Sequence, residues 1–193
     1  NPLNFTSGKV TSKSKVSVQY GMIEARAMVP DINLGGWPAL WLLGTANYSW
    51  PRCGELDMME MGHAKSFRDL HDEHNGGNGN NNSTVNQVVG ANAIFYADEA
   101  VTDGNPTGAA SISWDPEDNY CRPYYNYDNL HDRFLTYRMY WDPDSIRFTI
   151  IDDNVEHDFY TDVFPVDSIS DEFNSPFFFN INLAIGGTLT DAY

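Results

Sequence analysis

The chain has 193 residues, a formal net charge of −16 and an aromatic content of 14%. This length suits one large domain, and we predict a single domain over residues 1–193. The excess of negative charge argues against nucleic acid and against an anionic membrane surface as partners, and it fits a neutral substrate and a secreted protein. No apolar run approaches the ~20 residues that a membrane span needs.

Polar and apolar residues alternate with a period of two in the first part of the chain, which is typical of half-buried β-strands. Residues 10–20 are predicted to form one strand, with Lys9 and the lysines that follow as solvent-facing charges. Residues 20–29 form the next predicted strand, in which the small apolar side chains face the core. Glu24 and Arg26 of this strand therefore point to the opposite face.

Further short strands follow, separated by turn signals. These predicted strands cover residues 37–43, 86–96, 134–141, 146–151 and 177–185. Residues 71–84 are predicted as a polar surface loop, 120–127 as an aromatic-rich loop and 164–169 as a helical turn. Many short strands without a sustained helical period predict an all-β, antiparallel β-sandwich.

The predicted 71–84 loop holds two histidines and two acidic residues, at positions 71–74, that could ligate a metal. A solvated loop is a poor metal cage, and we predict neither a metal site nor a cofactor. The chain has two cysteines, Cys53 and Cys121. They could form a disulfide, or Cys53 could be a free buried thiol, and the sequence leaves both open.

Three carboxylates stand in one short apolar stretch, Glu55-Leu56-Asp57-Met58-Met59-Glu60. A buried strand normally excludes acids, so we expect these three to face a wet cleft while Leu56 and Met58 face a core. Glu60 would fall on the wrong face of a regular strand. One extra residue in a β-bulge at Met58 or Met59 restores the parity. The alternative is an edge strand with solvated acids.

Two carboxyl groups that flank a sugar linkage are what glycoside hydrolysis requires, at about 5–5.5 Å for retention of configuration. The segments around the acids are Gly36-Trp37-Pro38-Ala39-Leu40-Trp41-Leu42-Leu43-Gly44, Trp50-Pro51-Arg52-Cys53-Gly54-Glu55, Tyr20-Gly21-Met22-Ile23-Glu24-Ala25-Arg26, Tyr140-Trp141-Asp142-Pro143-Asp144-Ser145-Ile146 and Asn182-Leu183-Ala184-Ile185-Gly186-Gly187. Together with the bulged Glu-x-Asp-x-x-Glu motif, they resemble glycoside hydrolase family 16, and within it the laminarinase-like β-1,3-glucanases.

This resemblance implies a jelly-roll, concanavalin A-like β-sandwich with a substrate cleft on its concave face, and a retaining mechanism. By their positions in the motif, Glu55 would be the nucleophile and Glu60 the acid/base, while Asp57 would hold and tune the nucleophile. Trp50 matches a tryptophan beside the reacting sugar. Trp37 could add a stacking face or pack in the core, and Trp41 is expected in the core.

Glu24, Arg26 and Asn182 match residues that hydrogen-bond sugars on the non-reducing side, although Arg26 could instead pair with Glu24 across a strand face. Family members often carry His or Tyr in the strand after the catalytic one, where this chain has Ala93 or Ile94. Asn92 could substitute for that His or Tyr side chain. The family also has strands beyond both ends of this sequence, so the domain could be incomplete, permuted or completed by a second chain.

The leading functional hypothesis is an endo-acting, retaining β-glucanase that cuts β-1,3 or mixed β-1,3/1,4 glucan, a polysaccharide partner. One alternative is the same chemistry on another polysaccharide such as a β-galactan. Another is a carbohydrate-binding module without turnover. We expect a monomer unless a second chain supplies missing strands.

Overall fold

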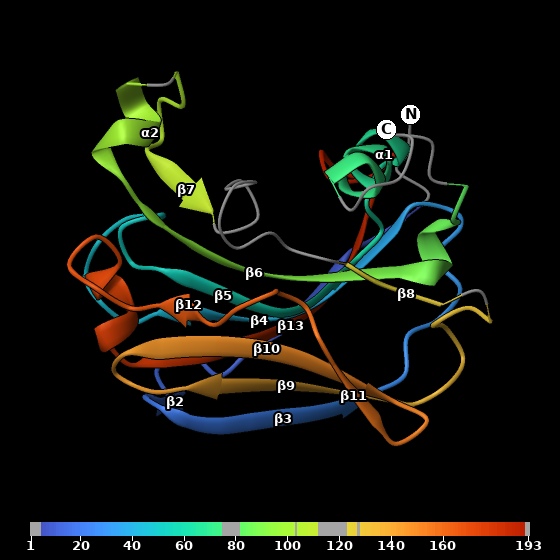
Figure 1. Ribbon diagram of the computed structural model, residues 1–193, viewed down its shortest axis with the longest axis horizontal. Helices are drawn as coiled ribbons and strands as arrows, with labels where there is room; N and C mark the ends of the chain where they lie inside the picture. The colour runs from blue at the N-terminus through green and yellow to red at the C-terminus, as the bar shows by residue number, and fades with distance from the viewer. Residues whose placement is uncertain (1–4, 75–81, 103, 112–122, 127, 192–193) are drawn as a thin grey trace.

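The computed structural model describes the chain apart from residues 1–4, 75–81, 103, 112–122, 127 and 192–193. Two antiparallel β-sheets lie face to face, and short helices stand beside them (Figure 1). The predicted all-β sandwich is therefore confirmed. Within the described residues, no helix has both the length and the apolar character needed to cross a membrane.

The larger sheet carries the acidic motif. Its strands, in spatial order, are β1 (Gly8–Thr11), β13 (Phe177–Ile185), β4 (Gly36–Gly44), β5 (Glu55–Met61), β6 (Val88–Tyr96) and β7 (Ala109–Ser111). Two short strands join it at the sides, β2 (Ser17–Val18) on β13 and β8 (Tyr124–Tyr125) on β6. Strands near both ends of the chain thus meet the central strands in one sheet, so the site is assembled from distant parts of the sequence.

The smaller sheet covers the other side of the core. It runs in the order β11 (Val155–Asp158), β10 (Ser145–Asp152), β9 (Leu135–Trp141) and β3 (Gly21–Ala27), with β12 (Phe164–Pro165) paired to β10. Figure 1 shows this sheet below the larger one, with β3 as its outermost strand. The helical elements are α1 (Lys65–His74), α2 (Asp98–Thr102) and two 3-10 turns, η1 (Val85–Gln87) and η3 (Asp171–Asn174).

The core fills the space between the sheets with alternate side chains from each strand. Leu56 on β5, Tyr137 and Met139 on β9, and Phe148 on β10 are at most 1% exposed. Burial of this apolar surface is the main stabilising term of such a sandwich. At Gly44 a Cβ would lie 1.7 Å from the backbone oxygen of Cys53, so only glycine allows this close approach of the chain.

Several predicted elements differ from the structure. Residues 10–20 are not one strand, because a turn with Ser14 at a φ of 63° separates β1 from β2. Hydrogen bonds from Lys15 N and Val16 N to the backbone oxygen of Ser12 close this turn. Both β1 and β2 pair with β13, so polar and apolar residues alternate on each side of the turn. The sequence therefore reads as one continuous strand.

The predicted loop over residues 71–84 is also wrong at its start, because α1 extends to His74. The ion pair Lys65–Asp69, at 2.7 Å and four residues apart, and the stacking of Phe67 on His63 stabilise this polar helix. Residues 75–81 lie outside the described part.

Smaller differences concern the later elements. The predicted strand over 86–96 begins with η1 and becomes β6 only at Val88. The predicted helical turn over 164–169 begins instead as β12. Of the aromatic-rich loop, Tyr124 and Tyr125 form β8. Cys53 is a free, buried cysteine, and Cys121 lies outside the described residues.

Candidate active site

A β-bulge in β5 decides which way the acids face. On β4, the neighbours Leu40 and Trp41 pair with Met59 and Asp57, which leaves Met58 as the extra residue. The register against β6 shifts at the same place, between Asp57 and Glu60. The predicted bulge is therefore confirmed, and it turns Glu60 to the face that Glu55 and Asp57 occupy.

The three acids line one cavity of about 420 Å³ on the outer face of the larger sheet. Its other walls come from β1, β4 and β13. The lining residues are Ser7, Gly8, Lys9, Trp37, Ala39, Trp41, Glu55, Asp57, Glu60, Asn182 and Ala184. A cavity that joins paired carboxylates to tryptophan rings is suited to a sugar, because a ring covers the apolar C–H face of a pyranose while the acids reach its oxygen atoms.

Each acid has its own hydrogen-bond partners. Trp37 donates from Nε1 to Glu60 Oε1 at 2.8 Å. The side chain of His63 approaches the other oxygen of Glu60, with 3.9 Å between Nε2 and Oε2. Glu55 accepts hydrogen bonds from the side chains of Trp50 and Asp57. The two glutamates are thus held by different partners.

Burial raises the pKa values of all three carboxyl groups, and the charges of neighbouring acids add to this effect for Glu55 and Asp57. Burial, and then the charge of Glu60, raise the pKa of Glu55 to about 7. Asp57 is 4% exposed, and burial followed by the charges of both glutamates raises its pKa well above the usual range. Burial also raises the pKa of Glu60, against the hydrogen bond from Trp37. The cluster therefore retains protons at pH values where free acids have lost them.

Glu55 has more contacts that favour its charged form than Glu60 has. Hydrogen bonds from Trp50 and Asp57 and the positive charge of Lys9 all lower the pKa of Glu55 against the effect of burial. For Glu60, the group that lowers the pKa is Trp37.

Two tryptophans of β4 face the cavity. Trp37 lines it and bonds Glu60, so it is a wall of the site rather than a core residue. Trp41 was expected in the core, and this prediction is wrong. Side chains alternate along β4, so Trp37, Ala39 and Trp41 share the cavity face while Leu40 and Leu42 point into the core.

Asn182 and Asn92 both lie on the cavity-bearing sheet. Asn182 lines the cavity and accepts a hydrogen bond from Trp41 Nε1 at 2.6 Å. Asn92 is the cross-strand partner of Asp57, so the two side chains share a face. Ser111 donates to Asn92 Oδ1 at 2.6 Å. Asn182 thus lines the cavity, whereas Asn92 lies beside Asp57 and is not among the described lining residues, and their roles in sugar binding stay predictions.

Glu24 and Arg26 are not among the described residues that line the cavity, so the structure does not bring them together with the acids. They lie on β3 of the smaller sheet, whose inner face is filled by Ile23, Ala25 and Ala27. Glu24 instead accepts a hydrogen bond from Arg138 Nε at 2.7 Å, and the Arg26 guanidinium lies 4.2 Å from the centroid of the Phe134 ring. Both belong to the outer, solvent-facing side of the sandwich.

Sequence reasoning missed Lys9 and His63. Lys9 lines the cavity, with its Nζ 4.1 Å from the centroid of the Trp41 ring. Its position follows from the register of β1 on β13, where Lys9 is opposite Asn182. That pairing joins segments more than 170 residues apart in the sequence, and no local sequence pattern predicts it. Among the described residues, no group of three or more His, Cys, Asp and Glu side chains is arranged to hold a metal ion.

The crowded acids make stability depend on pH. Their pKa values in the folded chain lie above the ordinary values of 3.8 for Asp and 4.5 for Glu, so the folded state binds more protons than the unfolded state. Their contribution to the free energy of unfolding should therefore be greatest below pH 4 and fall as the pH rises through 7.

Asp57→Asn replaces the most deeply buried of these carboxyl groups with an amide that cannot ionise. We expect it to raise the free energy of unfolding at pH 7 by ~1–3 kcal/mol, and to gain little at pH 4, where Asp57 is already protonated. Denaturant unfolding at the two pH values measures this. A variant that is less stable than the parent at pH 7 would show that the Asp57 carboxylate is favourable to the fold.

Comparison with known proteins adds an independent test. No family model matches the chain. The keratan-sulfate endo-1,4-beta-galactosidase of Sphingobacterium multivorum is 37% identical over 101 residues, which cover 50% of this chain and 24% of that protein. Glucan endo-1,3-beta-glucosidase A1 of Niallia circulans is 28% identical over 185 residues, which cover 95% of this chain and 23% of that protein.

A solved structure is similar over almost the whole chain. The Bacteroides ovatus mixed linkage glucan GH16 protein, in complex with a G4G4G3G product, gives a TM-score of 0.66 at 27% identity and covers 94% of this chain and 62% of its own. The chain spans about a quarter of the length of the two curated relatives. In sequence and in fold, its resemblance to laminarinase-like glycoside hydrolase family 16 is confirmed.

Proposed function

We propose that this chain is the catalytic part of an endo-acting, retaining β-glucanase that hydrolyses β-1,3 or mixed β-1,3/1,4 glucan. One observation carries the proposal: the bulge in β5 brings Glu55, Asp57 and Glu60 into a single cavity walled by tryptophans. The named relatives include an endo-1,3-beta-glucosidase and a mixed linkage glucan GH16 protein. We also propose that the protein is secreted, because its polysaccharide substrate would lie outside the cell.

The first half of the reaction uses both glutamates. Glu55, ionised, attacks the anomeric carbon, while Glu60 gives its proton to the glycosidic oxygen. The C–O bond to the leaving sugar breaks, and a covalent glycosyl–Glu55 ester remains. Asp57 donates a hydrogen bond to Glu55 and so holds the attacking oxygen in place.

The second half reverses the roles. Glu60, now ionised, takes a proton from a water molecule, and the water oxygen attacks the anomeric carbon from the side that the leaving sugar vacated. The ester to Glu55 breaks and the sugar leaves with its original configuration. Trp37 donates a hydrogen bond to Glu60 at 2.8 Å and so orients that carboxyl group through both steps.

A β-galactan hydrolase is the second candidate, and the keratan-sulfate endo-1,4-beta-galactosidase relative is the observation in its favour. The charge of the cavity favours the glucanase, because the three acids face a single lysine among its described lining residues. An anionic, sulfated chain would be repelled by such a site.

Initial rates of sugar release on laminarin, mixed-linkage glucan, soluble cellulose, agarose and keratan sulfate test the proposal. We expect the two β-1,3-containing glucans to be cut fastest. Faster cleavage of cellulose, agarose or keratan sulfate would overturn the glucan assignment. Binding of laminarin without any sugar release would instead indicate a carbohydrate-binding module.

Trp50 should contribute to both binding and the acid limb of the pH profile. Its side chain is 44% exposed and donates to Glu55, so it is not a core residue. Trp50→Phe keeps a ring but loses the N–H that stabilises the Glu55 carboxylate, so the acid limb of kcat/KM should move to higher pH. Trp50→Ala should also lose the ring and lower kcat/KM at every pH.

The matching stability measurement separates binding from folding. We expect both Trp50 variants to retain the unfolding midpoint of the parent. A large loss of stability with an unchanged pH profile would make Trp50 a structural residue.

A further inference from the structure

Lys9 brings a positive charge to the wall of the cavity that the three acids line. Its strand, β1, is separated from the acidic strand β5 by β13 and β4, and neither of these two strands carries an ionisable side chain. Lys9 is therefore the one cationic residue of these four neighbouring strands. No charge on the strands between them opposes its effect on the acids.

The position of Lys9 is fixed although β1 is an edge strand. Backbone N–H groups of β13 donate to the side-chain oxygen of Ser7 at 3.1 Å and to that of Ser12 at 2.9 Å, on either side of β1. Between these two anchors Lys9 lies opposite Asn182, so the two side chains share the cavity face. The register thus holds Lys9 at one place along the cavity.

The ring of Trp41 holds the ammonium group of Lys9. Trp41 donates from Nε1 to Asn182 Oδ1 at 2.6 Å, which fixes the ring on the cavity face. The Lys9 Nζ lies 4.1 Å from the centroid of this ring, within the range of cation–π attraction. The cross-strand partner of Trp41 on β5 is Asp57, the middle acid of the three. A cation on the Trp41 ring is therefore held against the acidic strand.

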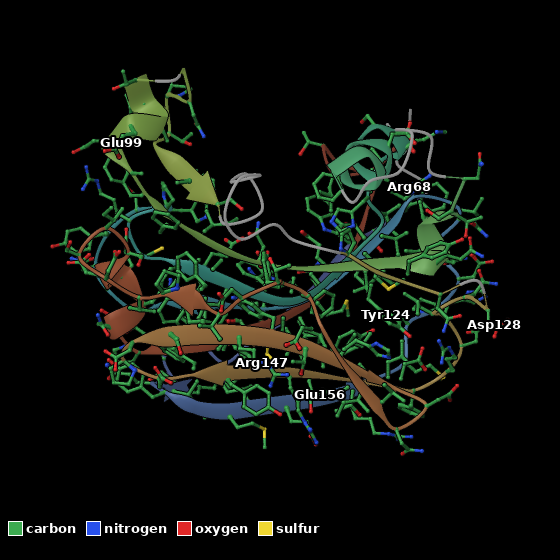
Figure 2. The ribbon with its side chains drawn as sticks, in the orientation of Figure 1. Arg68, Glu99, Tyr124, Asp128, Arg147 and Glu156 are labelled. Carbon is green, nitrogen blue, oxygen red and sulfur yellow. The ribbon has the colours of Figure 1, made fainter. Side chains whose placement is uncertain are left out.

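Arginine side chains near the acidic strand in sequence or in the fold are engaged elsewhere. Arg52, three residues before Glu55, places its guanidinium 3.4 Å from the centroid of the Tyr96 ring. Arg147 lies 3.9 Å from Glu156 on the smaller sheet, where Figure 2 labels both residues. Among the described residues, Lys9 is thus the cation whose charge acts on Glu55.

Several further groups surround the Glu55 carboxyl. They are Asp57 and Glu60 on β5, Trp50 and Cys53 in the preceding turn, Glu172 of η3 behind Cys53, and Tyr96 at the end of β6. Burial raises the pKa of the Cys53 thiol, so this group is uncharged at neutral pH. Burial and the charge of Glu60 raise the pKa of Glu55 to about 7, and the charge of Lys9 opposes them.

We propose that Lys9 is a positioning residue for the nucleophile, whose positive charge, held over Trp41, stabilises the carboxylate form of Glu55 that attacks the sugar. The inference rests on the proposed function and adds to it a residue that acts on the reaction through Glu55. Loss of this charge should move the acid limb of kcat/KM to higher pH, because Glu55 then ionises only at higher pH. Lys9 is exposed, so solvent and salt should weaken its effect.

Three lysine variants test the charge. Lys9→Met should move the acid limb on laminarin upward by about 0.5–1 pH unit at low salt, which lowers kcat/KM about three- to tenfold at pH values below the limb. Lys9→Arg should leave the limb in place, because a guanidinium also stacks on an indole ring. Lys15→Met, the control, removes the same charge from the exposed turn between β1 and β2 and should leave the limb unchanged.

Two further changes test how the charge acts. High salt should shift the limb of the parent toward that of Lys9→Met, and a limb that ignores salt would contradict an effect of the exposed charge. Trp41→Leu removes the ring that holds the ammonium, so Lys9→Met should shift the limb less on this background than in the parent. An equal shift on both backgrounds would show that Trp41 does not position the lysine.

Titration of the carboxyl groups by carbon-13 NMR without substrate separates this inference from the proposed function. The Glu55 signal is the one that Glu55→Gln removes, and Lys9→Met should raise its titration midpoint. If the parent releases no sugar from any glucan, the proposed function fails, and the midpoint still tests Lys9. Equal midpoints in the parent and Lys9→Met, or an equal shift in Lys15→Met or Lys9→Arg, would overturn the inference. Lys9→Gln replaces Lys9→Met if the latter does not fold.

Discussion

Glu55→Gln is expected to lower kcat on β-1,3-glucan by at least about 10⁴-fold. The amide has the shape of the carboxylate but cannot form the glycosyl ester, so both halves of the reaction stop. The fold should persist, because burial already disfavours charge at this position and raises the pKa of Glu55 to about 7. Reducing-sugar release at saturating laminarin, with an unfolding curve of the same preparation, measures both effects.

Glu24→Gln is the matched control for this change. Glu24 is also a glutamate on a strand, but it lies on the outer side of the smaller sheet and bonds Arg138. Its replacement should leave kcat and KM as they are. Turnover by Glu55→Gln within tenfold of the parent would refute the nucleophile assignment, and a large loss in Glu24→Gln would refute the placement of Glu24 outside the site.

Glu60→Ala is expected to lower kcat on laminarin by about 10²–10⁴-fold, because the leaving sugar then departs without a proton. A dinitrophenyl glycoside has a leaving group that needs no proton, so formation of the glycosyl–Glu55 ester should remain fast on it. Hydrolysis of the ester should be slow, since no base activates water. Added azide should then restore turnover and yield the β-glycosyl azide.

The configuration of the azide product assigns the two glutamates separately. In Glu60→Ala, azide attacks the ester from the face that the removed carboxyl occupied, and two inversions give the β product. In Glu55→Ala, azide would replace the nucleophile directly and give the α product by one inversion. An α-azide from Glu60→Ala would exchange the roles proposed for the two residues.

The alternation of side chains along one strand was sufficient to predict that the three acids share a face. Glu55, Asp57 and Glu60 can share a face only if one residue bulges, and burying an unpaired acid in the core is costly, so the sequence alone indicated a bulge at Met58 or Met59. The register shift at Met58 agrees. The same local argument predicted which side chains of β3 face the core.

The alternation of side chains along a strand does not reveal which of the two sheets the strand belongs to. Glu24 and Arg26 face away from the core as predicted, but β3 lies in the smaller sheet, so that face is the outer side of the molecule and not the cleft. Likewise Trp41 alternates with Leu40 and Leu42, and the sequence does not reveal that the tryptophan side is the cavity side.

The chain by itself therefore determined the strand periods, the sandwich class, the bulge and the three acids, because each depends on neighbours within a few residues. The tertiary structure alone decided that Lys9 meets Asn182, that the α2–β7 segment stands beside Trp50, and that Glu24 is remote from the acids. These depend on strand order and register between distant segments, which are chosen by the packing of the whole core and leave no local pattern.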